Sequence, residues 1–139
     1  MGYATLKFGF DGNWTMDYVY MRAAEMYLIE AECYARLNQG PKAAKVLGEL
    51  MKFRQPSWSK NGVSLNDVLL QRRIELWGEG FSYFDLRRQY KGINRNYAGS
   101  NHLEEAKMEV GPDDARWLFQ IPTSEIREND MISETDQNP

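Results

Sequence analysis

Residues 20–56 read YMRAAEMYLIEAECYARLNQGPKAAKVLGELMKFRQP, and this stretch decides the fold. Apolar residues recur in it every three or four positions, which predicts one helix over about residues 17–38 and a second over about residues 41–54. Pro41 suits the first turn of the second helix, and Pro56 marks a point that this helix does not pass. Because the connection is so short, we expect the two helices to form an antiparallel αα-hairpin.

The hairpin also has the residue spacing of a known repeat. Its apolar positions match the register of the 34-residue tetratricopeptide unit. The matching positions are Tyr27, Ala31 and Tyr34 in the first helix and Ala43, Leu47 and Leu50 in the second. The small side chains among them would let the two helices approach closely. Since one repeat cannot bury its own face, other polypeptide must pack against it.

A third helix is expected after the hairpin. Ser64, followed three residues later by Asp67, approximates a capping box and predicts a helix that runs to about residue 79. Gly80 is expected to bend or break this helix before a further helical stretch, residues 81–90. One stripe of this region steps by four and three residues and is predicted to be core. Its members are Leu70, Ile74, Trp77, Phe81 and Phe84.

Shorter elements are expected elsewhere. Residues 3–10 alternate between polar and apolar side chains and predict a short strand. Residues 91–116 are polar and predict a long irregular loop, which an apolar extended run over residues 117–121 follows. Thr123 is expected to cap a short helix that reaches about residue 129.

The expected fold is therefore mainly α. It combines a tetratricopeptide-like αα-hairpin over residues 20–56 with extra helices, one or two short strands and long loops. A chain of 139 residues predicts a single domain over residues 1–139, in which residues 1–2 have the look of an added start.

The composition argues against several classes of function. The net charge is −3 and basic residues alternate with acidic ones, so no nucleic-acid partner is expected. No apolar run approaches the roughly 18 residues that span a bilayer, so no transmembrane segment is expected. Cys33 lies in an apolar helical pattern and is predicted to be a buried, inert thiol. His102 is the only histidine and lacks convergent partner ligands, so no metal is expected. Gly78 and Gly80 lack the strand-then-helix context of a phosphate-binding loop, and no other cofactor is expected either.

Residues 69–88, LLQRRIELWGEGFSYFDLRR, are the most densely charged part of the chain. Glu75 and Glu79 share one helix face, which raises the possibility of a general acid and base pair. Such pairs flank a substrate from two sides, whereas these two point the same way, and Arg72 would keep Glu75 ionised. We therefore predict no catalytic residue and interpret the segment as a structural ion network. Its predicted members are Arg22, Arg72, Glu75, Glu79 and Asp85.

Aromatic residues in predicted loops are the candidates for ligand binding. Trp58, Tyr90 and Tyr97 are candidates because exposed aromatic rings stack on sugars or apolar ligands. The alternative interpretation, which we favour for each and also for Trp14, is that these rings cover the apolar face of the hairpin.

Four motifs in order make the chain resemble the C-terminal region of the SusD/RagB family. Residues 21–32, MRAAEMYLIEAE, are similar to the family helix R-x-x-E-x-Y-L-x-x-A-E. Residues 71–88 follow the pattern E-R-R-x-E-L-x-x-E-G-x-R-x-x-D-L-x-R, except that Gln71 replaces glutamate and Ser82 replaces arginine. Residues 119–126, FQIPTSEI, resemble the segment P-I-P-x-x-E-I, and Asn-Pro at 138–139 closes the match. Because Ser82 cannot neutralise an acid, the ionic partner of Glu79 is left open.

The resemblance implies a function and a location. Members of this family are cell-surface lipoproteins of Bacteroidetes that bind glycans or other nutrients beside a SusC-like, TonB-dependent transporter in the outer membrane. They are several times longer than this chain, and much of their ligand surface lies upstream of the matched region. The resemblance also implies a lipid anchor in an N-terminal region, and Cys33 cannot supply it from the middle of a helix.

We therefore expect a non-enzymatic fragment of a SusD-like nutrient-binding lipoprotein. The alternative is a free-standing tetratricopeptide-type module that binds a peptide or a partner helix. A third possibility, a glycosidase that uses Glu75 and Glu79, predicts that Glu75→Gln abolishes hydrolysis and preserves the fold. The sequence leaves the identity of the ligand open.

Overall fold

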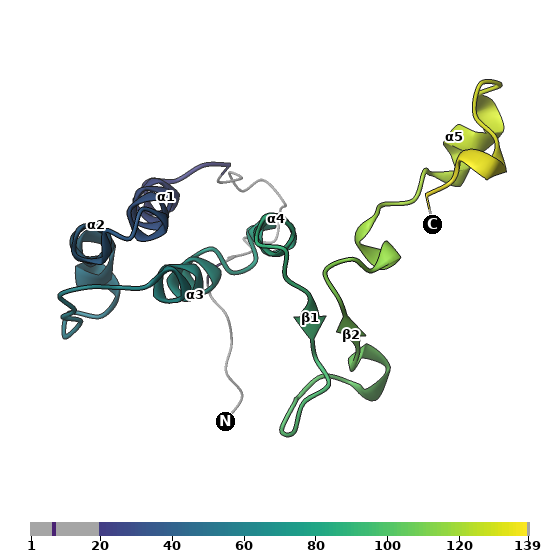
Figure 1. The fold of residues 1–139 in the computed structure, drawn as a ribbon. Coiled ribbons are helices and arrows are strands. Elements are labelled where there is room, and N and C mark those ends of the chain that lie inside the picture. Colours follow the sequence, from purple (N-terminus) through teal and green to yellow (C-terminus); the bar gives the residue numbers. More distant parts are fainter. Residues whose placement is uncertain (1–6, 8–19, 139) are drawn as a thin grey trace, which may run out of the picture. The chain divides into compact units, whose positions relative to one another are not determined.

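The computed structural model describes Lys7 and residues 20–138. The strand predicted over residues 3–10, apart from Lys7, lies outside the described residues, as do Trp14 and the expected start of the first helix. The helices are α1 (Ala23–Arg36), α2 (Gly40–Arg54), α3 (Leu65–Glu75), α4 (Phe81–Arg88) and α5 (Thr123–Glu128). The strands are β1 (Ile93–Asn94) and β2 (Glu109–Val110), and 3-10 turns form at Glu104–Ala106, Ala115–Trp117 and Glu134–Asp136. Figure 1 shows the predicted mainly α character, which is confirmed.

The chain divides into two compact units, Met1–Trp77 and Gly78–Pro139, and each is described by itself below. The expectation of a single domain stays a prediction, because two compact units can belong to one domain.

The first unit is built on the predicted pair of helices, which is confirmed. Helices α1 and α2 pack side by side (Figure 1). The buried residues of the pair include Leu28, Ala31, Ala43 and Leu47. Ala31 and Ala43 are both fully buried, and their small side chains would let the two helices approach closely. Cys33 is exposed on α1, so the prediction of a buried thiol is wrong. The α1 residues that face the core lie on the opposite side of the helix.

The turn between α1 and α2 contacts the loop that precedes α3. Gly40 begins α2, and its carbonyl accepts a hydrogen bond of 3.2 Å from the amide of Val63. A side chain at position 40 would place its Cβ 3.1 Å from the carbonyl oxygen of Val63, so this close approach favours glycine. The contact brings the loop before α3 against the start of α2.

Helix α3 packs on α1 and begins as predicted. The amide of Asp67 donates to the Ser64 hydroxyl at 3.2 Å, and the Ser64 amide donates to the Asp67 carboxylate at 2.8 Å. This reciprocal pair confirms the capping box. The helix ends at Glu75 rather than near residue 79, because Gly78, with φ of 79°, reverses the backbone shortly afterwards.

The prediction of which α3 stripe forms the core is wrong. Leu70, Ile74 and Trp77 are 54%, 59% and 55% exposed. The buried stripe is instead Val68, Arg72 and Leu76, which steps by four residues along the opposite face. Arg72 lies in the core because it forms an ion pair of 3.6 Å with Glu25 of α1.

The second unit begins at the predicted helix break. Gly80 has φ of 82°, a left-handed conformation that suits glycine, and α4 starts directly after it. Phe81 of α4 is half-buried and Phe84 is exposed, so these two positions do not continue a core stripe either. No apolar side chain of this short helix is buried.

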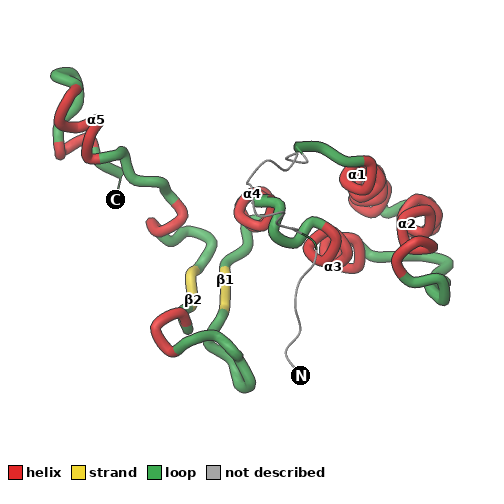
Figure 2. The backbone as a smooth tube through the Cα atoms, turned by 180° about the vertical axis from the view of Figure 1, so that it is seen from behind, coloured by secondary structure: helices red, strands yellow, loops and turns green. Residues whose placement is uncertain are grey.

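Residues 91–116, predicted to be irregular, contain a small antiparallel ladder. Strands β1 and β2 lie side by side (Figure 2). Ile93 pairs with Val110, and Asn94 pairs with Glu109. A Cβ on Gly92 would lie 2.1 Å from the carbonyl oxygen of Val110, so glycine is required beside the ladder. Two-residue strands carry too short a pattern for periodicity to detect.

The last part of the second unit differs from the prediction in one detail. Helix α5 starts at Thr123, with Pro122 at the N-cap position and no side-chain cap, so Thr123 is not the cap. Pro122 restricts the backbone φ angle at the residue that directly precedes the helix. The Gln137 side chain pairs with the backbone of Ile121, accepting from its amide at 2.7 Å and donating to its carbonyl at 3.0 Å.

Candidate functional site

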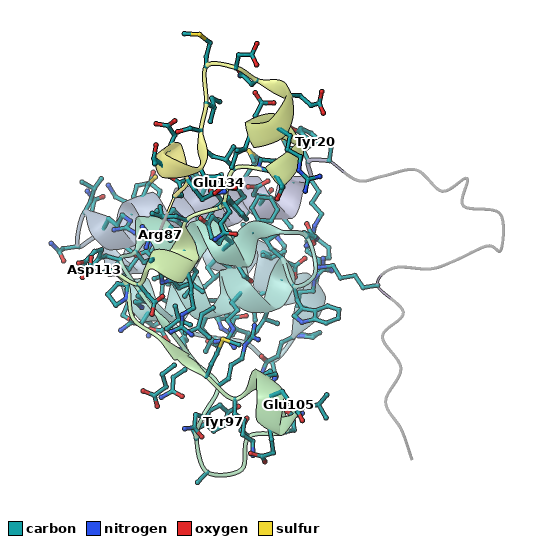
Figure 3. All side chains as sticks on the ribbon, turned by 90° about the vertical axis from the view of Figure 1, so that its right-hand side faces the viewer. Tyr20, Arg87, Tyr97, Glu105, Asp113 and Glu134 are labelled. Atoms are coloured by element: carbon teal, nitrogen blue, oxygen red, sulfur yellow. The ribbon has the colours of Figure 1, made fainter. Side chains whose placement is uncertain are left out.

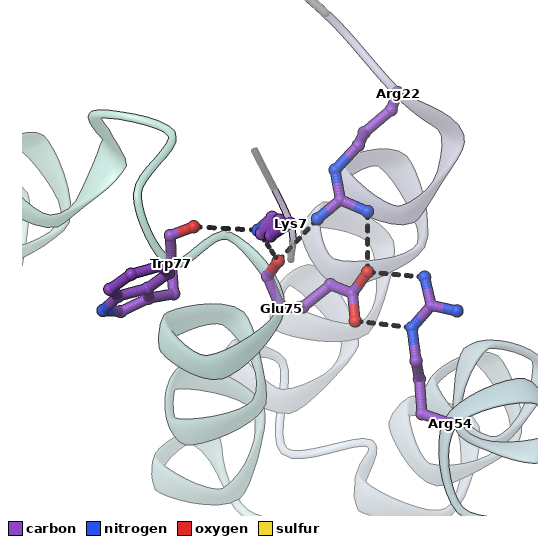
Figure 4. A network of polar contacts seen from close by, with 5 residues as sticks. All are labelled: Lys7, Arg22, Arg54, Glu75 and Trp77. Carbon is purple, nitrogen blue, oxygen red and sulfur yellow. Dashed lines mark hydrogen bonds and ion pairs between the residues drawn. The ribbon is translucent and has the colours of Figure 1, made fainter. Parts of the chain in front are cut away.

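The charged segment places Glu75 at the centre of a polar cluster in the first unit (Figure 4). Glu75 is the last residue of α3, and its side chain is only 11% exposed. Arg54, the last residue of α2, donates from Nε to Oε2 at 2.9 Å and from Nη2 to Oε1 at 2.8 Å. Arg22, which precedes α1, donates from Nη1 to Oε1 at 2.7 Å. One carboxylate therefore joins the ends of three helices.

Arg22 and a further cation, Lys7, also satisfy backbone groups at the end of α3. Arg22 donates from Nη2 to the Glu75 carbonyl oxygen at 2.5 Å. Lys7 donates from Nζ to the carbonyl oxygens of Glu75 at 2.7 Å and Trp77 at 2.8 Å (Figure 4). The last carbonyls of a helix have no partner within it and carry partial negative charge, so cations stabilise this end.

These contacts keep Glu75 ionised. The hydrogen bond from Arg54 and, to a smaller extent, the one from Arg22 together lower the pKa of Glu75 from its ordinary value of 4.5 to about 2, against the opposing effect of burial. Glu75 in turn raises the pKa of Arg54. A carboxylate with so low a pKa cannot donate a proton near neutral pH. Both of its oxygens are also occupied by guanidinium groups, which suits a brace between helices and not a general acid.

The predicted ion network is divided between the two units. Arg22 and Glu75 meet in the first unit, while Arg72 pairs with Glu25. The cations that lower the pKa of Glu75 are Arg54 and Arg22, so the role that we gave to Arg72 is corrected. Glu79 and Asp85 belong to the second unit, in which Asp85 pairs with Arg88 at 2.8 Å.

The sequence did not identify Arg54 as a member of this cluster. Arg54 lies 21 residues before Glu75, and only the fold of the hairpin brings it close. The sequence places Arg54 in the last turn of α2, but a basic residue is common there because it interacts favourably with the negative end of the helix dipole. Its position therefore does not single it out as a partner of Glu75.

Trp58 lies against α2. A Cβ on Gly48 would be 3.2 Å from Cζ3 of the Trp58 ring, so the indole covers the helix at this glycine. Trp58 is half-buried, and its backbone amide donates to the Gln55 carbonyl at 2.8 Å. Glycine at position 48 leaves room for the ring, which favours the packing interpretation of Trp58 over ligand binding.

Tyr90 and Tyr97 both belong to the second unit and are 62% and 56% exposed. The Tyr90 hydroxyl donates to a carboxylate oxygen of Asp113. Tyr97 lies in the connection between β1 and β2, where its carbonyl accepts from the amide of Ser100 at 3.0 Å. Figure 3 shows Tyr97 with Glu105 in one part of this unit, away from Arg87 and Asp113. The two tyrosines therefore do not form one platform.

Helix α4 and the turn that follows it make three contacts with the segment after β2. Arg87 donates from Nη1 to the carbonyl oxygen of Pro112 at 2.5 Å, and Tyr83 donates to the Trp117 carbonyl at 2.5 Å. The third contact is the Tyr90–Asp113 hydrogen bond. Arg87 also lies over the buried Trp117 ring, 5.5 Å from its centroid. Local sequence patterns do not indicate this arrangement, because its partners are 23 to 34 residues apart.

Lys7 and residues 20–138 contain no group of three or more histidine, cysteine, aspartate or glutamate side chains arranged to hold a metal ion. A hollow of about 460 Å³ lies between the α1–α2 turn and the start of α3. It is lined by Ala35, Arg36, Asn38, Gly40, Val63, Ser64 and Leu65, none of which is a predicted site residue. Among the described helices, none is both long and apolar enough to cross a bilayer.

Comparison with known proteins gives two matches. A family model described as the SusD family matches residues 9–139. A SusD-like protein of Formosa agariphila is 29% identical over 87 aligned positions, which cover 54% of this chain and 17% of that protein. The chain thus aligns with about a sixth of the length of this curated relative. No solved structure matches.

Proposed function

The chain belongs to the SusD family, and from this premise we propose that it is part of a longer cell-surface lipoprotein that binds glycans or related nutrients. The observation that carries the proposal is the family match over residues 9–139. The proteins of this family are binding proteins. In the proposed function the chain supplies helical scaffold, and the protein passes its ligand to a SusC-like, TonB-dependent transporter in the outer membrane.

The geometry around Glu75 supports a binding protein over a glycosidase. A glycosidase needs one carboxyl that is protonated at working pH and a second one across the scissile bond. Glu75 has a lowered pKa and is held by Arg54 and Arg22. We infer that this carboxylate fixes α1, α2 and α3 to one another and takes no part in chemistry.

The proposed location is the external side of the outer membrane. The lipid anchor would be attached upstream of the matched region, because Cys33 lies inside α1 and cannot be an N-terminal acylated residue. No residue of the chain is proposed to hold a cofactor, and nucleic acid is not a proposed partner.

The alternative function is a free-standing tetratricopeptide-type interaction module. It is favoured by one observation, the helical hairpin with an exposed apolar stripe on α3 next to it. Such a module would bind a peptide or a helix rather than a sugar.

The discriminating experiment begins with the complete gene. If the proposal is correct, we expect the gene to encode a lipoprotein signal and a few hundred further residues upstream of Tyr3. The complete protein is then assayed for glycan binding by affinity electrophoresis on polysaccharide gels, and for co-purification with a TonB-dependent transporter. Retarded migration on at least one polysaccharide together with transporter recovery would support the proposal. Failure of both would refute it.

A further inference from the structure

Tyr90 occupies a backbone position that normally requires glycine. After α4 ends at Arg88, the Lys91 amide donates to the Leu86 carbonyl at 2.9 Å and the Tyr90 amide donates to the Arg87 carbonyl at 3.0 Å. These two bonds define a Schellman motif, whose C′ residue must be left-handed. Tyr90 has φ of 52°, as the motif demands. A bulky residue in this conformation is strained, because its Cβ crowds the backbone.

The end of α1 provides a comparison within the same chain. There the Gln39 amide donates to the Tyr34 carbonyl at 2.9 Å, the Asn38 amide donates to the Ala35 carbonyl at 3.1 Å, and Asn38 has φ of 58°. Asparagine tolerates this conformation well, and tyrosine does not. Strained residues of this kind gather at ligand-binding sites, where another requirement outweighs the strain.

The Tyr90 ring is fixed in place while most of it stays open to solvent. The side chain is 62% exposed, and its hydroxyl donates to Oδ1 of Asp113. This hydrogen bond raises the pKa of Tyr90, so the phenol remains a protonated donor at neutral pH. A tethered ring loses less conformational freedom when a ligand stacks on it than a free ring does.

Two polar groups next to the ring keep hydrogen-bonding capacity. Among the described residues, no donor contacts the second carboxylate oxygen of Asp113, which is an exposed residue. Arg87 uses Nη1 on the Pro112 carbonyl and stacks on Trp117, which leaves N–H donors on its guanidinium. Figure 3 shows Arg87 and Asp113 near each other in this unit, as the bond to Pro112 requires.

We propose that Tyr90, Asp113 and Arg87 form a subsite for one pyranose ring of a neutral oligosaccharide. The C–H face of the sugar would stack on the Tyr90 ring, with one hydroxyl donating to Asp113 and another accepting from Arg87. The negative and positive charges balance, so the subsite favours neither an anionic nor a cationic sugar. This inference rests on the proposed glycan-binding function and assigns it to named residues.

The test is a calorimetric titration of the purified chain with maltohexaose, cellohexaose and laminarihexaose. Tyr90→Gly removes the ring and suits the left-handed backbone, so we expect an unchanged or higher melting temperature together with an affinity lower by about tenfold. Asp113→Ala should also weaken binding, because it removes both the tether and an acceptor. Leu103→Ala is the control, since it removes an exposed apolar side chain (77% exposed) from the same unit and belongs to no candidate site. It should bind as the wild-type chain does.

The outcomes separate this inference from the proposed function. A wild-type chain that binds a hexasaccharide equally well after Tyr90→Gly would overturn the subsite and leave the family function standing. A Tyr90→Gly variant that fails to fold would show that the ring is a packing residue, which also overturns the subsite. No binding of any hexasaccharide by the chain overturns the subsite, and the assay of the complete protein then decides the proposed function independently.

Discussion

Replacing Glu75 by glutamine tests the interpretation of the charged segment as a brace. The substitution preserves the shape of the side chain and removes the charge that faces Arg22 and Arg54. A fall in the pKa of Glu75 from 4.5 to about 2 corresponds to about 3 kcal/mol of preference for the carboxylate in the folded state. The Arg54 side chain is 49% exposed, so solvent screens part of this interaction. We therefore expect Glu75→Gln to lower the free energy of unfolding by about 2 kcal/mol.

The assay is urea denaturation at pH 7, followed by far-ultraviolet circular dichroism. Glu49→Gln is the matched control, because Glu49 forms an exposed pair with Lys52 one turn away on α2. Such a surface pair contributes little, and the control should lose less than about 0.5 kcal/mol. The two variants make the same chemical change and differ in the burial of the carboxylate.

The dependence on pH gives a second readout of the same variant. The folded pKa of Glu75 lies below its unfolded value, so its contribution to stability is complete above about pH 4.5 and is lost as the pH falls toward 2. The unfolding free energies of wild type and Glu75→Gln should therefore converge in acid. If Glu75→Gln equals Glu49→Gln at pH 7, or if its deficit persists unchanged at low pH, the brace interpretation is refuted.

Three further predictions test the fold. Val68→Ala should lower the free energy of unfolding by about 2 kcal/mol, because Val68 is fully buried. Leu70→Ala, at a position that is 54% exposed, should lower it by less than about 0.5 kcal/mol. Equal losses for the two variants in urea titrations would contradict the assigned core. Ser64→Ala should lower stability by about 1 kcal/mol through loss of the capping box, and calorimetric melting measures this. Gly92→Ala should disrupt the β1–β2 ladder, because its Cβ would lie 2.1 Å from the Val110 carbonyl oxygen; unchanged amide exchange in the ladder would contradict this.

The features that the sequence predicted correctly depend on local rules. The α1–α2 hairpin follows from apolar spacing and from Pro41, and the start of α3 follows from Ser64 and Asp67. Each of these signals lies within a few residues of the structure that it predicts. Helix starts and the spacing of apolar residues along a helix can therefore be predicted from a single sequence.

The features that the sequence missed depend on distant partners. Helix α3 has two stripes, and its periodicity does not tell which one faces α1. Apolar composition favours the stripe with Leu70, but the pairing of Arg72 with Glu25 allows the other stripe to be buried. Arg54 and the Tyr90–Asp113 bond were missed for the same reason, since the fold brings these partners together. The left-handed backbone of Tyr90 could not be predicted for a further reason, because no glycine marks that position at the end of α4.

The most direct test of the central claim asks whether the protein binds a glycan and leaves it intact. The protein encoded by the complete gene is incubated with a panel of polysaccharides and oligosaccharides. Binding is measured by calorimetry, and the recovered sugar is analysed by chromatography. We predict that at least one glycan binds and is recovered uncleaved. Failure to bind any glycan, or cleavage that Glu75→Gln abolishes, would contradict the account.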